Sequence, residues 1–94
     1  AVAAGTMLAA ELSRRLGYLT DTDVGRIAAL FERARLPVKA PALGVETYMS
    51  YMEVDKKVEG GRLRFVLLKR LGEAFVTADV PADVLRATLD EATA

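Results

Sequence analysis

The stretch MEVDKKVEGGRLRFVLL, residues 52–68, changes from helical to extended character along its length. Its first part continues an apolar stripe with helical spacing, which predicts a helix over residues 45–57. The adjacent Gly60 and Gly61 should end that helix. The apolar run after the glycines is rich in residues that favour β structure, so we expect a strand over 62–68. The apolar stripe consists of Val45, Tyr48, Met49 and Met52.

A second β-favouring run at 73–77 should pair with the first through a turn over 69–72. Apolar periodicity predicts further helices over 21–35 and after Pro81, and a continuous run of small and aliphatic residues predicts one over 1–16. The predicted fold class is therefore mainly α, with about four helices and a small two-stranded β element.

Local signals support these boundaries. Gly17 is typical of a helix C-cap, and Thr20 with Asp23 three positions later resembles a capping box. The segment 36–44 contains two prolines and a glycine, so it should be an extended connection. Its apolar residues suggest that it lies against the core.

The composition limits the possible functions. Lysine and arginine total 13, aspartate and glutamate total 13, and the formal net charge is zero, which indicates no nucleic-acid footprint. The chain has no cysteine, which excludes disulfides and fits a cytoplasmic protein. It also has no histidine, so the commonest metal ligand and general base is missing.

Residues 1–10 are small or aliphatic on every helical face. A helix of that kind is normally buried against other elements. It has neither an initial Met nor a capping residue, so we expect its natural beginning to lie upstream. The run lacks a basic leader and is shorter than the roughly 20 residues that span a bilayer, so neither a signal peptide nor a membrane segment is expected.

Lys56 and Lys57 are the strongest candidates for a binding site. They precede a glycine loop that would let a ligand approach the backbone, and lysine suits phosphate or carboxylate. A basic pair is also favoured at the end of any helix by the helix dipole. On these residues alone the structural interpretation is favoured.

Other charged residues give weaker signals. Arg62 and Arg64 should share one strand face, where they could bind an anion or simply be solvated. Lys69 and Arg70 in the turn have the same two interpretations. The acidic residues form no metal-ligand pattern, and no dinucleotide or phosphate-loop motif occurs.

Three stretches carry a resemblance to the C-terminal part of 3-dehydroquinate synthase. AVAAGTMLAA at 1–10 resembles the family's helix after a His-Gly-Glu sequence, and ARLPV at 34–38 resembles a later connection. The most specific stretch is residues 52–68, followed by LGEA at 71–74. The similarity extends over essentially all 94 residues, which would form part of the helical C-terminal domain without the N-terminal NAD-binding domain.

The resemblance implies a cytoplasmic, phosphate-eliminating lyase of the shikimate pathway of aromatic amino acid biosynthesis. Such an enzyme converts 3-deoxy-D-arabino-heptulosonate 7-phosphate into 3-dehydroquinate and phosphate, using NAD and a divalent metal, zinc or cobalt. It would be a homodimer that binds a small phosphorylated substrate and neither nucleic acid nor membrane. The metal ligands and NAD site would lie upstream, so the 94 residues alone should bind no cofactor, contain no catalytic residue and be inactive.

For this segment, the resemblance implies that Lys56 and Lys57 bind the substrate phosphate, with Lys56 preferred. Asp55 would be a structural partner of the lysines. Two alternatives are another sugar phosphate cyclase, which would close a different ring, and a non-catalytic helical interaction module. In such a module, the apolar first helix would be the partner-binding face. The upstream sequence would discriminate between the enzyme and the module.

Overall fold

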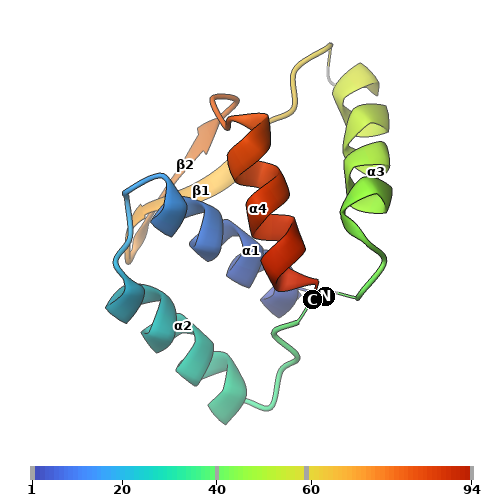
Figure 1. Ribbon diagram of the computed structural model, residues 1–94. Coiled ribbons are helices and arrows are strands. Elements are labelled where there is room, and N and C mark those ends of the chain that lie inside the picture. Colours follow the sequence, from blue (N-terminus) through green and yellow to red (C-terminus); the bar gives the residue numbers. More distant parts are fainter. Residues whose placement is uncertain (1, 40, 59, 94) are drawn as a thin grey trace.

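The computed structural model describes residues 2–39, 41–58 and 60–93 (Figure 1). Within those residues, the chain forms four helices and one two-stranded antiparallel sheet, which confirms the predicted mainly α class. The elements in chain order are α1 (Val2–Arg15), α2 (Asp21–Arg33), α3 (Val45–Val58), β1 (Phe65–Arg70), β2 (Glu73–Thr77) and α4 (Ala82–Ala92).

Helix α1 is the central element, and it packs against β1, α2 and α4. Figure 1 shows α4 crossing in front of it. Ala10 and Leu12 are almost completely buried, and Ala3 and Ala4 are buried near the start of the helix. The expected burial of this apolar helix is thus largely provided by elements of the same chain. Gly5, however, is exposed.

The main hydrophobic core contains leucines from three elements. Leu12 of α1, Leu67 of β1, and Leu85 and Leu89 of α4 form one buried cluster. Burying each such side chain contributes roughly 1.5 to 3 kcal/mol. The predicted apolar stripe of α3 packs against this cluster and is partly buried. A second cluster joins α1 to α2 and consists of Ala10, Leu19 and Val24.

The predicted caps are present at two helix ends. Gly17 has a φ of 90°, and the Tyr18 N–H donates to the Ser13 carbonyl at 2.8 Å, as in a Schellman-type termination. Thr20 and Asp23 form the reciprocal bonds of a capping box at the start of α2. Helix α2 ends two residues earlier than predicted, because Arg35 adopts a left-handed φ of 58°.

The first strand was predicted too early. It begins at Phe65, which pairs with Thr77, the last residue of β2. Arg62 and Arg64 therefore lie in the connection before the sheet, and the prediction that they share a strand face is wrong. Lys69 and Arg70 belong to β1, so the turn contains only residues 71–72. Strand pairing begins at Phe65 because β2 ends at Thr77. The β propensity of residues 62–68 contains no information about where the partner strand ends.

The connection between α2 and α3 differs from the prediction in its burial. Leu36 is 47% exposed and Leu43 is 51% exposed, so these leucines do not lie in the core. Val38 is partly buried, and the Tyr48 hydroxyl donates to the Pro41 carbonyl at 2.5 Å. The described residues of this connection therefore lie on the surface and contact the rest of the protein at a few points, such as Val38 and Pro41. Among the described helices, none has an apolar run long enough to cross a membrane.

Candidate phosphate-binding hollow

The end of α3 determines where Lys56 lies. The Gly61 N–H donates to the Lys56 carbonyl at 2.7 Å, which closes the last helical turn. Gly60 and Gly61 have φ angles of 77° and 92°, a region that residues with a side chain rarely adopt. The glycine pair therefore turns the chain at the end of α3, and Arg62 and Leu63 of the following segment line the same hollow as Lys56.

This reversal creates an open hollow at the junction of helix and strand, which we call the α3 hollow. Its walls come from α3, from the connection to β1 and the start of that strand, from the segment that links β2 to α4, and from the start of α4. It is lined by Glu53, Lys56, Gly61, Arg62, Leu63, Phe65, Ala78, Val80, Ala82 and Leu85. Lys56 and Arg62 are its two cationic residues, whereas Lys57 is exposed and does not line it.

Each cation of the α3 hollow has an acidic neighbour. The Lys56 Nζ lies 4.0 Å from a Glu53 carboxylate oxygen, and its side chain is 45% exposed. An Arg62 guanidinium nitrogen lies 3.7 Å from a carboxylate oxygen of Asp79. Ion pairs this exposed contribute about 0 to 1 kcal/mol, so either cation can exchange its carboxylate for a bound anion at little cost.

The other basic candidate of this stretch, Arg64, lies outside the α3 hollow. Arg64 lines an adjoining apolar hollow that also includes Met52 and Leu12. The side chain of Asp55 lies outside the described residues, so its pairing with the lysines stays a prediction.

That Arg62 lines this hollow could not be predicted from its position in the sequence. The opposite wall comes from Ala78 and Val80, which follow β2 in the chain. The one sequence signal for the hollow is the glycine pair itself, which forces the chain to turn back.

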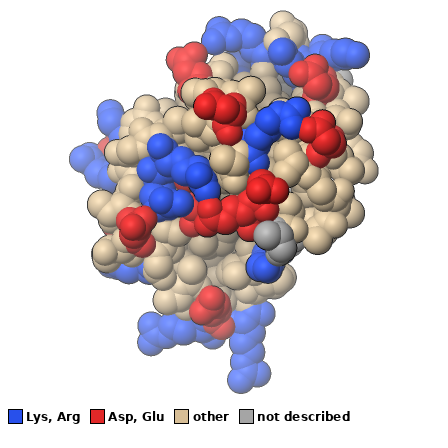
Figure 2. All heavy atoms as spheres, viewed as in Figure 1, with Lys and Arg blue, Asp and Glu red and all other residues tan. Residues whose placement is uncertain are grey.

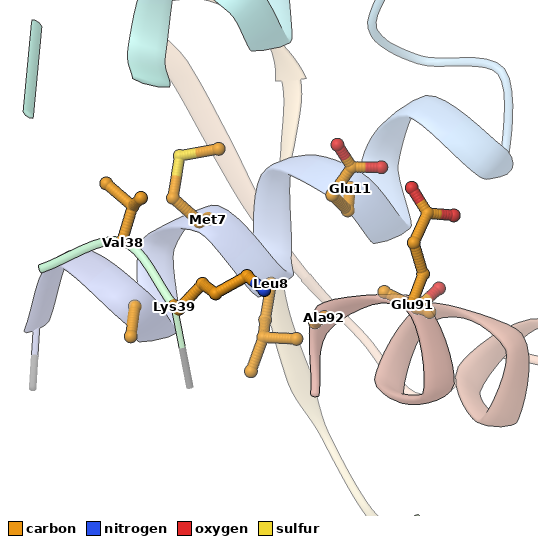
Figure 3. A pocket seen from close by; sticks show the side chains of 9 residues that line it. Met7, Leu8, Glu11, Val38, Lys39, Glu91 and Ala92 are labelled. Atoms are coloured by element: carbon orange, nitrogen blue, oxygen red, sulfur yellow. The ribbon is translucent and has the colours of Figure 1, made fainter. Parts of the chain in front are cut away.

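A second hollow lies between α1, the segment at Val38 and Lys39, and the end of α4 (Figure 3). Its walls are largely apolar, and Glu11 and Glu91 lie at one end. Both acids are already paired with arginines. The Arg14 guanidinium donates to Glu11 at 2.8 Å, and this bond raises the pKa of Arg14. Glu91 pairs with Arg15.

The charges of the visible face are mixed in sign. Figure 2 shows lysine and arginine side chains beside aspartate and glutamate, in keeping with the balanced composition. In the described parts of the chain, no group of three or more carboxylate, histidine or cysteine side chains is arranged to hold a metal ion.

These features define a mainly helical chain with a hollow, lined by two basic residues and one acidic residue, where a helix passes into a hairpin. The chain belongs to the 3-dehydroquinate synthase family, because the family model for the 3-dehydroquinate synthase C-terminal region matches residues 1–58. Both candidate lysines lie inside the matched range.

Three relatives that match nearly the whole chain are each named 3-dehydroquinate synthase. A 3-dehydroquinate synthase of Nitrosospira multiformis is 55% identical over 94 residues, which is 100% of this chain and 26% of that protein. One from Azotobacter vinelandii is 55% identical over 91 residues, covering 96% of this chain and 25% of that protein. One from Nitrosococcus oceani is 52% identical over 94 residues, 99% of this chain and 26% of that protein. The chain thus spans about a quarter of the length of these relatives.

Proposed function

We propose that this chain is a segment of a cytoplasmic, homodimeric 3-dehydroquinate synthase. The complete enzyme would convert 3-deoxy-D-arabino-heptulosonate 7-phosphate into 3-dehydroquinate and phosphate, in the pathway to the aromatic amino acids. Support comes from the family match and from relatives of that name along the whole chain. The missing N-terminal domain would be the principal partner of this segment.

Within that enzyme, we propose that Lys56 binds the phosphate group of the substrate. The observation that carries this role is the position of Lys56 in the wall of the α3 hollow, beside Arg62 and the Gly61 backbone. Lysine recognises phosphate as a point charge, and a charge-assisted hydrogen bond is stronger than a neutral one. Lys57 is exposed outside the hollow, so we assign it a smaller role.

NAD and a divalent metal, zinc or cobalt, would be bound by other parts of the complete enzyme. The chain lacks histidine and cysteine, and its described carboxylates are not grouped for a metal. These residues therefore do not fit a zinc or cobalt site, and the chain has no nucleotide-binding glycine motif for NAD. In this proposal the segment supplies an anion-binding wall, and alone it is inactive.

The two alternatives are less well supported. Another sugar phosphate cyclase would share the domain, but the relatives at about half identity carry the name 3-dehydroquinate synthase. An interaction module would present α1 as a binding face. Much of α1 is covered instead by β1, α2 and α4.

The role of Lys56 can be tested in the complete enzyme with Lys56→Ala and with Lys57→Ala as the matched control. Losing a charge-assisted bond worth roughly 1.5 to 3 kcal/mol should lower kcat/KM about ten- to a hundred-fold for Lys56→Ala. Lys57→Ala should have a much smaller effect. The measurement is steady-state kinetics beside thermal unfolding, in which both variants should melt close to the unmodified enzyme.

Arg62→Ala adds a comparison within the same hollow. We expect a smaller loss than for Lys56→Ala, because the Arg62 side chain is 70% exposed and already lies near Asp79. Equal and small kinetic effects of both lysine substitutions would overturn the assignment and leave the lysine pair as an ordinary helix end.

A further inference from the structure

Glu53 and Lys56 lie three positions apart on α3, and both line the α3 hollow. A Glu53 carboxylate oxygen is 4.0 Å from the Lys56 Nζ. A glutamate three positions before a lysine is a favourable arrangement, because the two side chains then share one face of the helix. The ammonium group that we assign to the phosphate thus already has a carboxylate beside it, within the same hollow.

The α3 hollow has no excess positive charge in its resting state. Its lining contains the cations of Lys56 and Arg62 and the carboxylate of Glu53. Asp79 offsets the second cation, because one of its carboxylate oxygens lies 3.7 Å from an Arg62 guanidinium nitrogen. The formal charges of these four side chains therefore cancel.

A phosphate that enters the hollow has to compete with Glu53 for Lys56. It either separates the ammonium group from the Glu53 carboxylate or lies close to that carboxylate. The first outcome loses an attraction between opposite charges, and the second adds a repulsion between like charges. Both lower the affinity of the hollow for phosphate.

We propose that Glu53 is a positioning residue that acts through Lys56 and keeps the affinity of the α3 hollow for phosphate low. This inference rests on the proposed function, in which phosphate is a group of the substrate and also a product. A contact that binds substrate and transition state equally well lowers KM without raising kcat. By competing for Lys56, Glu53 lets the phosphate product leave the hollow.

The test is a titration of the complete protein with inorganic phosphate, followed by phosphorus NMR. The ionic strength is low and constant, because salt screens exposed charges. Glu53→Gln removes the carboxylate charge at nearly the same side-chain size. Glu32→Gln, at an exposed position of α2, makes the same chemical change and is the matched control. Figure 1 shows α2 and α3 on opposite sides of the molecule.

Glu53→Gln should lower the Kd for phosphate about two- to fivefold, the range expected for one exposed charge contact. Glu32→Gln should leave the Kd unchanged. In steady-state kinetics, Glu53→Gln should lower the KM and strengthen inhibition by phosphate without raising kcat. An unchanged Kd for Glu53→Gln would overturn the proposal. A raised Kd would also overturn it, because Glu53 would then hold Lys56 in its binding position.

Asp79→Asn separates the contact with Lys56 from the total charge of the hollow. It removes the same charge beside Arg62 instead of beside Lys56. We expect a smaller change in the Kd than for Glu53→Gln. Equal decreases for the two variants would reject the proposal, because the total charge and not the contact with Lys56 would then determine the affinity.

Lys56→Ala and the turnover of the unmodified complete protein separate this inference from the proposed function. Lys56→Ala should raise the Kd for phosphate about tenfold or more. If it does so and Glu53→Gln has no effect, the inference alone fails. If Lys56→Ala leaves the Kd unchanged, the phosphate-binding role of Lys56 and the inference are both rejected. The expected pattern of Kd values without 3-dehydroquinate synthase turnover would reject the enzymatic function and retain the role of Glu53.

Discussion

Ser13 is a buried polar residue at the contact between α1 and β1. Its hydroxyl donates to the Ala9 carbonyl at 2.7 Å and accepts the Leu68 N–H at 2.9 Å. The side chain is completely buried, so it cannot use water instead. One hydroxyl thereby satisfies a backbone donor of the strand and attaches the sheet to the central helix.

Ser13→Ala should lower the free energy of unfolding by about 1 to 3 kcal/mol, because the Leu68 N–H loses its partner inside the protein. Ser50→Ala, at an exposed position of α3, is the control and should change stability by less than about 0.5 kcal/mol. Urea denaturation of both variants measures the difference. Similar stability for the two would mean that water or a backbone shift replaces the serine hydroxyl.

At the scale of elements, α3 is attached to the rest of the molecule chiefly through α4. The outer side of α3 faces solvent, and Tyr51 and Val54 are both exposed there. An ion pair between Glu46 and Arg86 joins α3 to α4. The hydrogen bond from Arg86 lowers the pKa of Glu46. This pair links the helix that carries Lys56 to the main core.

The ion pair predicts a pH-dependent coupling between Glu46 and Arg86. A carboxylate whose pKa is lower in the folded protein stabilises it above the unfolded pKa of about 4.3, and that contribution is lost as the pH falls through the folded value. A double-mutant cycle with Glu46→Gln and Arg86→Gln should therefore give a small favourable coupling at neutral pH and none in acid. Urea unfolding at several pH values supplies the free energies. A coupling that does not change with pH would contradict the prediction.

The sequence predicts the elements better than it predicts their contacts. The α3 stripe, the Thr20 capping box and the glycine terminations are local signals, and they correctly indicated four helices and a hairpin. The start of β1 depends on where β2 ends, so Arg62 was wrongly assigned to the strand. Ser13 could not be recognised because its acceptor role requires Leu68, 55 positions later.

At the scale of the whole molecule, the isolated 94-residue chain should bind neither zinc nor NAD with micromolar affinity. Its residues include no histidine or cysteine, and no nucleotide-binding glycine motif occurs. Isothermal titration calorimetry of the purified 94-residue chain tests this, with the complete protein as the positive control. Micromolar binding of either ligand to the isolated chain would show that its site uses residues of this segment.

The central position of α1 also has a consequence for biosynthesis. Helix α1 is the first described element to be translated, but two of its covering elements, β1 and α4, come from the second half of the chain. At roughly 5 to 20 residues per second, the faces of α1 that β1 and α4 cover stay exposed for several seconds during synthesis. During that interval the nascent chain exposes apolar surface, and the burial of α1 against α4 must wait until α4 has left the exit tunnel.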